Sequence, residues 1–257
     1  MVMAGLVAIL CSGQGLQHPA MFDLVANCPE AEPVFAAAAG VLGQDPRCFV
    51  RQSAPAELFS DLTGQILCCT QALAAWAALG TVRPPRAVIA GYSVGELAAW
   101  GCAGALKAPG TLRLAQRRAA LMDAAAPSDG GLAAIVGLRR PTLEPILARH
   151  AVSIAIVDDV DVFVVGGRRT RLKAACQEAA ARGARHTVSL KVALPSHTPL
   201  GPSQRKSRGR LWMAPVVTHC VIFNAIERLS HVFRAFARFW AVQMVLRAPE
   251  NHRFSPI

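Results

Sequence analysis

Short apolar runs alternate with alanine-rich segments in the first half of the chain. Residues 6–10 form a continuous apolar run that ends in Ser12-Gly13-Gln14-Gly15, which is typical of a buried parallel strand entering a tight turn. We expect a helix to follow that turn, and the apolar run 86–90 predicts a second short strand. Helical composition marks 30–42, 61–79, 94–106 and 110–126, with breaks at Pro46, Pro55, Pro84-Pro85 and Pro109. This alternation predicts an α/β fold with a mostly parallel sheet.

The order of elements changes after about residue 130. The pattern predicts strands at 132–138, 152–157, 160–165 and 186–192, and helices at 141–149 and 169–182. This β-α-β-β-α-β order is the ferredoxin-like arrangement, so we expect it to be an inserted ferredoxin-like small domain. The predicted domains are a large α/β domain at 1–128, the small domain at 129–193, and a return to the large domain at 194–257.

Hydrophobic periodicity decays beyond Pro199. Residues 201–210 are polar and basic, and in the remainder of the chain only 229–245 has the pattern of an amphipathic helix. The last sixty residues, 198–257, carry nine of the 27 Lys and Arg but two of the 16 Asp and Glu. We therefore expect the tail from about residue 201 to be atypical or partly disordered.

Composition narrows the class of protein. Apolar residues make up 53% of the 257 residues and charged residues 17%, which excludes intrinsic disorder. The longest apolar runs fall well short of the roughly 20 residues that a membrane-spanning helix needs. The net charge of +11 suggests an acidic partner, an anionic substrate or nucleic acid. Much of that excess lies in the tail, and stacking platforms are scarce because Tyr92 is the only tyrosine. We therefore expect neither nucleic acid nor a membrane as a partner.

The eight cysteines show no CxxC spacing and lie mostly in apolar stretches. We interpret them as reduced, buried thiols of a cytoplasmic protein rather than as a disulfide framework. The apolar N-terminus has no Lys or Arg before its run, which favours a core strand over a secretory signal. We expect neither a metal ion nor a cofactor.

A candidate nucleophile follows the second predicted strand. Gly91-Tyr92-Ser93-Val94-Gly95 has the G-x-S-x-G pattern between a strand and a helix, the context in which that pattern forms a nucleophile elbow. The glycines allow a sharp turn, and the following helix N-terminus offers N–H groups to a developing oxyanion. The alternative is a merely structural glycine turn, which the strand-turn-helix context disfavours.

Three further features are candidates for the same site. His197, one of seven histidines, comes just after the last predicted strand of the small domain, where we expect the rim of an interdomain cleft; it is either a general base or an ordinary loop histidine. The loop at 12–15 is an oxyanion loop or a phosphate cradle, but it lacks the spacing of nucleotide-binding loops. Arg117-Arg118 is a solvated pair on a helix or a clamp for a carboxylate.

These motifs, in this order, strongly resemble the malonyl-CoA:acyl carrier protein transacylases. The resemblance rests on Gly13-Gln14-Gly15, the elbow followed by Glu96, an Arg about 25 residues later, the ferredoxin-like insert and Pro195-Ser196-His197. It covers residues 5 to about 200. Within that family, the amino-acid sequences of residues 91–101 and 195–200 look most like those of the epsilon subunit of malonate decarboxylase.

The resemblance implies a hydrolase-like acyltransferase core and a role for each matching residue. Ser93 would accept the acyl group, with His197 as its general base. The backbone N–H groups of Gln14 and Val94 would form the oxyanion hole, and Arg118 would bind the free carboxylate of the malonyl group. The implied reaction moves malonyl from malonyl-CoA to the thiol of an acyl carrier protein, here the carrier subunit of malonate decarboxylase.

The resemblance ends after Leu200. Family members carry a late Gly-rich segment and a Gln or Asn that orients the catalytic histidine, and Asn224 and Gln243 are the only plausible substitutes in this chain. We expect an aberrant C-terminus that arises from a reading-frame change near codon 200. Two alternatives to malonyl transfer therefore stay open: a serine esterase or acyl hydrolase, and an inactive remnant that binds carrier protein.

Overall fold

The computed structural model describes residues 7–83, 87–192 and 194–200. The chain divides into two compact units, the first reaching Ala120 and the second beginning at Leu121. The predicted tail, its helix at 229–245, and Asn224 and Gln243 lie outside the described residues. The predicted domain boundaries and the inserted character of the small domain stay predictions.

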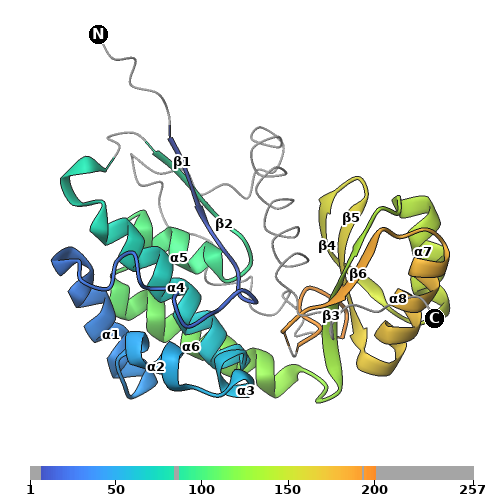
Figure 1. Cartoon of the computed structure of the whole chain (residues 1–257), viewed down its shortest axis with the longest axis horizontal. Helices are drawn as coiled ribbons and strands as arrows, with labels where there is room; N and C mark the ends of the chain where they lie inside the picture. The colour runs from blue at the N-terminus through green and yellow to red at the C-terminus, as the bar shows by residue number, and fades with distance from the viewer. Residues whose placement is uncertain (1–6, 84–86, 193, 201–257) are drawn as a thin grey trace, which may run out of the picture. The chain divides into compact units, whose positions relative to one another are not determined.

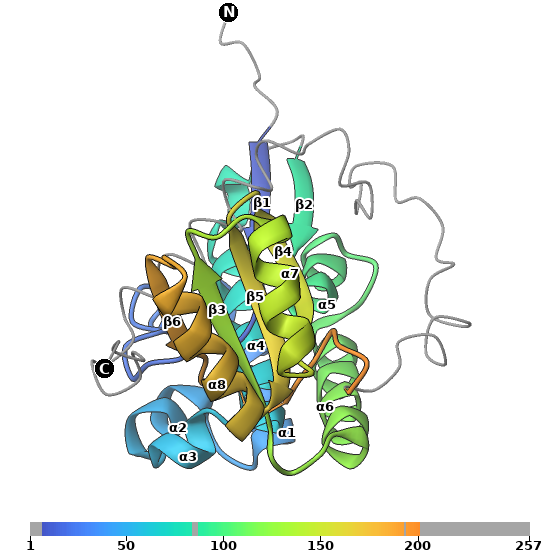
Figure 2. The ribbon, with the colours of Figure 1, turned by 90° about the vertical axis from the view of Figure 1, so that its right-hand side faces the viewer.

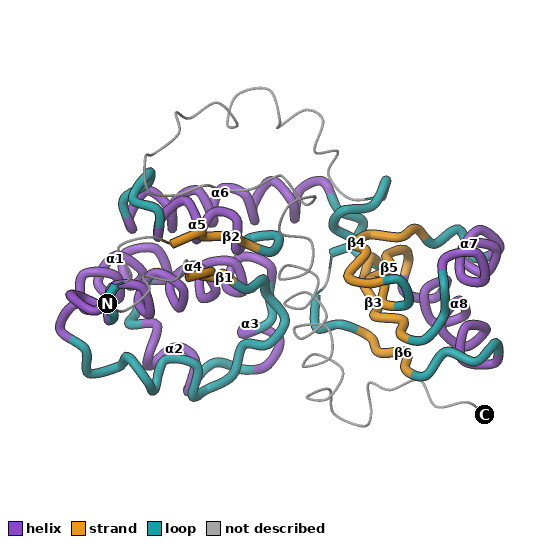
Figure 3. Tube along the Cα trace, turned by 90° about the horizontal axis from the view of Figure 1, so that it is seen from above, coloured by secondary structure: helices purple, strands orange, loops and turns teal. Residues whose placement is uncertain are grey.

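A parallel pair of strands positions the elbow in the first unit (Figure 1). Strand β1 (Val7–Cys11) pairs with β2 (Ala87–Gly91) in a register that runs from Val7 opposite Ala87 to Cys11 opposite Gly91. Parallel strands need a long crossover connection, and here the crossover carries the helices of residues 29–82. The predicted α/β fold with a parallel sheet is confirmed, and Figure 3 shows α5 (Gly95–Cys102) beside the strand pair.

Most helices of this unit lie where the pattern predicts them. They are α1 (Glu32–Leu42), α4 (Asp61–Ala78), α5 and α6 (Ala108–Ala125), whose C-terminal end belongs to the second unit. Helix α4 begins at the cap residue Ser60, whose hydroxyl accepts from the N–H of Thr63 at 3.2 Å. It packs against α1 and α5, and its Leu67 is fully buried. Burial of one such side chain contributes about 1.5–3 kcal/mol.

Two kinds of expectation about this unit are wrong, namely three predicted breaks at prolines and a helix directly after the loop at 12–15. Pro46 and Pro55 are not breaks but the first residues of α2 (Pro46–Gln52) and α3 (Pro55–Leu58), and Pro109 is the second residue of α6. Proline suits the first turn because its missing N–H has no acceptor there and its φ is preset for a helix. No helix follows the loop at 12–15 directly; the chain passes through turns to the 3₁₀-helices η1 (Pro29–Ala31) and, later, η2 (Gly80–Val82).

The second unit has the predicted β-α-β-β-α-β order. Strands β3 (Gly130–Val136), β4 (Ser153–Asp159), β5 (Val162–Arg168) and β6 (His186–Ser189) form an antiparallel sheet in the order β4-β5-β3-β6. Helices α7 (Arg140–Arg149) and α8 (Arg169–Ala181) lie on one face of that sheet (Figures 1 and 2). Alternate strand residues such as Ile135 and Phe163 are buried in the core shared with these helices. Strand β6 ends three residues before the predicted Val192.

Seven cysteines lie in the described residues, and none of these forms a disulfide. Five are buried, as expected, whereas Cys48 is exposed and Cys28 is partly so. Burial raises the pKa of Cys68 and of Cys176 to about 12. Such thiols stay protonated near neutral pH and are poor nucleophiles. Cys220 lies outside the described residues. Within the part of the chain that the structure describes, no helix is both long and apolar enough to cross a membrane.

Candidate active site

Ser93 occupies a strained turn between β2 and α5. Its φ is +55°, and among the described residues other than glycine only Ala151 and His197 also have a positive φ. The N–H of Tyr92 donates to the carbonyl of Cys11 at 3.0 Å, and the N–H of Gly95 donates to the carbonyl of Tyr92 at 2.9 Å. A left-handed serine costs about 1–3 kcal/mol, and such strain is concentrated at functional sites. The geometry is that of a nucleophile elbow.

Both glycines of the motif are required by close backbone contacts. A Cβ on Gly91 would lie 2.1 Å from the backbone of Gly95, and a Cβ on Gly95 would lie 2.2 Å from the carbonyl oxygen of Cys11 and 2.7 Å from that of Ser12. Real Cβ atoms do not approach backbone so closely. The second contact seats the elbow directly on the end of β1, where the loop of residues 12–15 begins.

The two predicted oxyanion donors therefore belong to neighbouring backbone segments of the first unit. Val94 is fully buried, and Gln14 lies three residues beyond the end of β1. In the turns and loops that the structure describes, neither N–H group donates to a backbone carbonyl. The thiol of Cys68 on α4 donates to the carbonyl of Gly13 at 3.4 Å and holds the loop. Two N–H groups of this kind suit a developing oxyanion, and their role in an oxyanion hole stays a prediction.

The two arginines of α6 have different environments. Arg117 is exposed, whereas Arg118 is partly buried and donates from Nη1 to Oε1 of Gln65 at 2.7 Å. Burial lowers the pKa of the Arg118 guanidinium, and the carboxylates of Asp61 and Glu96 oppose that shift. A guanidinium held in this way retains donors for a carboxylate, since it has five N–H groups. Arg118 as the malonyl clamp stays a prediction.

Sequence reasoning missed two residues that connect these parts. Asp61 and Gln65 lie one turn apart on α4, and both are buried, with 4% and 0% of their surfaces exposed. The Gln14 side chain donates from Nε2 to Oδ1 of Asp61 at 2.8 Å, and Gln65 donates from Nε2 to Oδ2 of Asp61 at 2.7 Å. A chain of hydrogen bonds thus runs from Gln14 through Asp61 and Gln65 to Arg118. The i, i+4 spacing of two polar residues in an apolar helix was the signal available in the sequence.

His197 belongs to the second unit and has a φ of +61°. It is partly buried in a turn that the hydroxyl of Thr198 closes by donating to the carbonyl of Pro195 at 2.6 Å. This turn packs tightly on the sheet, because a Cβ on Gly130 would lie 2.4 Å from the Pro195 ring, and one on Gly166 would lie 2.8 Å from Thr198. His197 thus has a defined backbone conformation, and its role as general base stays a prediction.

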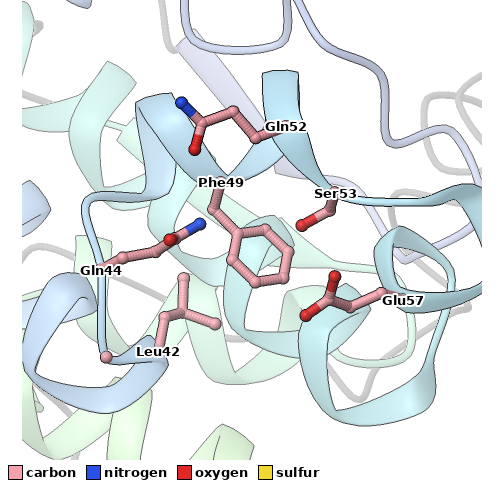
Figure 4. Close-up of a pocket in the computed structure, with 7 residues that line it drawn as sticks. Leu42, Gln44, Phe49, Gln52, Ser53 and Glu57 are labelled. Carbon is pink, nitrogen blue, oxygen red and sulfur yellow. The ribbon is translucent and has the colours of Figure 1, made fainter.

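A pocket of about 330 Å³ lies elsewhere in the first unit (Figure 4). Its lining comes from α1, α2, α3 and the segments that connect them, with the Phe49 ring among polar side chains such as Gln44, Gln52 and Glu57. None of the candidate site residues lines it.

Residues 63–209 match the acyl transferase domain family. The chain belongs to this family. It is 31% identical over 202 residues to the malonyl CoA-acyl carrier protein transacylases of Salmonella typhimurium and of Escherichia coli K12. Each alignment covers 75% of this chain and 65% of the relative. This acyl transferase domain therefore spans about two thirds of the length of the curated relatives.

Solved structures agree with the family assignment. The malonyl CoA-acyl carrier protein transacylase of Coxiella burnetii has a TM-score of 0.69 at 32% identity, covering 78% of this chain and 66% of that one. A malonyl-transacylase in complex with its type II PKS acyl-carrier protein has a TM-score of 0.68 at 29% identity, covering 76% and 66%. The fold of this acyl transferase domain is therefore shared with those enzymes. The closer resemblance to malonate decarboxylase stays a prediction.

Proposed function

We propose that the protein transfers a malonyl group from malonyl-CoA to the thiol of an acyl carrier protein through a malonyl ester of Ser93. The observation that carries this proposal is the elbow itself, with Ser93 at φ +55° and Gly95 seated on the end of β1. The names of the relatives support this choice of substrates, since both relatives are malonyl CoA-acyl carrier protein transacylases.

The chemistry follows from the groups present. His197 takes the proton of the Ser93 hydroxyl, and the oxygen attacks the thioester carbonyl of malonyl-CoA. The N–H groups of Gln14 and Val94 bind the oxyanion of the tetrahedral intermediate. The C–S bond then breaks, and CoA leaves as its thiol with the proton from His197. In the second half, the carrier thiol gives its proton to His197 and attacks the ester, and Ser93 regains its hydroxyl.

Arg118 accounts for the choice of a dicarboxylic acyl group. Its guanidinium would bind the free carboxylate of malonyl, and acetyl would leave it without that partner in a partly desolvated position. Hydrogen bonds to charged groups are worth about 1.5–3 kcal/mol, which corresponds to roughly a 10- to 150-fold preference for malonyl.

We further propose the malonate decarboxylase system as the context, with its carrier subunit as the acceptor. The support is the amino-acid sequence of residues 91–101 and 195–200, which resembles that of the epsilon subunit of malonate decarboxylase. A serine esterase would share the elbow but would have no use for a partly buried arginine beside it, and so Arg118 favours transfer over hydrolysis. The other alternative, an inactive remnant that binds carrier protein, depends on the tail from about residue 201 and not on Arg118.

For that tail we propose a reading-frame change near codon 200. Its support is the concentration of basic residues in 198–257 and a family match that ends at residue 209. Translating the coding DNA in the other two frames tests it: a Gly-rich ending typical of the family should appear in one of them. If neither frame restores such an ending, the hypothesis is wrong.

Covalent labelling tests the proposed reaction. The protein is incubated with malonyl-CoA or acetyl-CoA, and adducts are detected by intact mass. We expect a malonyl adduct that Ser93→Ala abolishes and that Arg118→Ala slows about 10- to 100-fold. Arg117→Ala is the matched control. Arg117 is the exposed neighbour of Arg118, so its removal should leave the malonylation rate unchanged. Preferential acetylation of the wild-type protein would contradict the carboxylate clamp, and no adduct at all would favour the inactive remnant.

A further inference from the structure

We infer that Asp61 is a positioning residue, which sets the orientation of the Gln14 and Gln65 amides and, through Gln65, aims Arg118 at the acyl carboxylate. The inference rests on the proposed function, because it assigns the binding of the malonyl carboxylate to Arg118. Asp61 itself does not touch the substrate.

The geometry around Asp61 uses both of its oxygens. Oδ1 accepts from Nε2 of Gln14 at 2.8 Å, and Oδ2 accepts from Nε2 of Gln65 at 2.7 Å. An ionised carboxylate only accepts hydrogen bonds, so each glutamine must turn its NH₂ group towards Asp61. The orientation of two amides, which are otherwise free to flip, is thereby decided by one acidic side chain.

For Gln65 this orientation determines what Arg118 meets. With its NH₂ directed at Asp61, Gln65 presents Oε1 to the guanidinium and accepts from Nη1 at 2.7 Å. A flipped amide would present a second donor to a group that has only donors. Gln65 is fully buried, so water has little access to repair the loss. Asp61 therefore decides whether Arg118 has an acceptor that fixes its direction.

For Gln14 the same carboxylate ties down the loop that carries a predicted oxyanion donor. Helix α4 approaches this loop closely at Gly64, where a Cβ would lie 2.5 Å from Nε2 of Gln17 and 3.4 Å from Oε1 of Gln14. The carbonyl of Leu58 accepts from Nε2 of Gln17 at 3.5 Å, just before α4 begins. Residues at and just before the start of α4 thus bind the loop of residues 12–15, and Gln65 of the same helix binds Arg118.

The carboxyl group of Asp61 is buried, and its charge is only partly compensated. Burial raises its pKa above the ordinary value, and the hydrogen bonds from Gln14 and Gln65, together with the positive charge of Arg118, reduce that shift without reversing it. Asp61 is also the first residue of α4, where a negative charge is favoured by the helix dipole. These contacts support the acceptor-only form on which the amide orientations depend.

Asp61→Asn separates positioning from packing because it changes little in volume. The new amide at position 61 would direct an NH₂ group at one of the two glutamines, and that glutamine must then flip its own amide or lose its hydrogen bond to position 61. We expect the KM for malonyl-CoA to rise and the malonyl-to-acetyl preference of Ser93 acylation to fall about tenfold. Acetylation, which does not use the clamp, should change less.

Two double variants show whether the effect of Asp61→Asn on acyl preference depends on Gln65 and Arg118. In Asp61→Asn/Gln65→Glu the carboxylate and amide exchange places, and every hydrogen bond from Gln14 to Arg118 can form again. We expect this exchange to restore most of the preference. In an Arg118→Ala background, Asp61→Asn should produce almost no further loss of preference, since coupled residues are not additive.

Asp45→Asn is the matched control for a purely structural effect. Asp45 caps α2 and accepts from the backbone N–H of Arg47 at 2.8 Å, outside the proposed site. It should lower the thermal midpoint without changing the acyl preference of the folded protein. If the wild type is malonylated and Asp61→Asn matches it in both KM and preference, the inference about Asp61 is wrong. If the wild type forms no malonyl ester on Ser93, the proposed function fails and the inference fails with it.

Discussion

Ser93 and His197 share an unusual backbone conformation, with φ of +55° and +61°. The third such residue among those described, Ala151, lies just after α7, where left-handed residues commonly end helices. Neither Ser93 nor His197 has that explanation. A left-handed backbone at a residue other than glycine lowers stability, and such strain is concentrated at functional sites.

The steric role of Gly95 leads to a prediction about stability. Gly95→Ala would place a Cβ 2.2 Å from the carbonyl oxygen of Cys11, so the elbow or the end of β1 must shift. We expect the free energy of unfolding to fall by about 1–3 kcal/mol, as for other overpacked sites, together with loss of Ser93 acylation. Urea unfolding followed by circular dichroism measures the first effect.

Gly40→Ala is the control for that substitution. Gly40 lies inside α1, and a Cβ there would meet nothing within 4 Å among the described residues. Alanine is the better helix former, so this variant should be stabilised by about 0.5–1 kcal/mol. Equal effects at positions 40 and 95 would contradict the steric role of Gly95.

Helices α7 and α8 are joined by an acidic residue rather than by apolar contact alone. Glu178 of α8 pairs with Arg149 at the end of α7, and His150 Nε2 lies 2.9 Å from its Oε2. Arg182, just after α8, is a further partner at 3.7 Å. The hydrogen bonds with Arg149 and His150 lower the pKa of Glu178 from its ordinary value of 4.5. This contribution to stability is therefore present above pH 4.5 and is lost as the pH falls through the lowered pKa.

Acid unfolding tests this link. Glu178→Gln should lower stability near neutral pH and flatten the loss of stability between about pH 5 and pH 3, as read from thermal midpoints across that range. Glu144→Gln is the control, because Glu144 pairs with the exposed Arg140 of its own helix and should leave the acid profile close to that of the wild type. If Glu178→Gln has the same acid-unfolding profile as the wild type, the contacts of Glu178 with Arg149 and His150 contribute nothing to stability.

Elements with strong local patterns were predictable, and those decided by capping or packing were not. The β-α-β-β-α-β order followed from apolar runs such as 160–165, where the structure has β5, whereas α2 was missed because Pro46 starts a helix where the pattern indicates a break. Asp61 and Gln65 were missed for a different reason. Polar residues at helical spacing usually face solvent, and only the approach of α6 and the loop at 12–15 makes these two an interior pair.

Across the whole molecule, the motif residues are divided between two units. Ser93, Gln14 and Arg118 belong to the first unit, and His197 to the second. The described residues hold all five residues of the predicted site, and the tail from residue 201 lies beyond them. The proposed roles therefore assign the nucleophile to the first unit and the general base to the second.

A two-step transfer assay tests the proposed malonyl transfer. The wild-type protein is first labelled with malonyl-CoA, freed of excess reagent, and then mixed with an acyl carrier protein that bears a phosphopantetheine thiol. Mass spectrometry follows the malonyl group on both proteins. We predict that it begins as an ester on Ser93 and moves to the carrier thiol. Release as free malonate without carrier labelling, or a label on any residue other than Ser93, would contradict the proposed function.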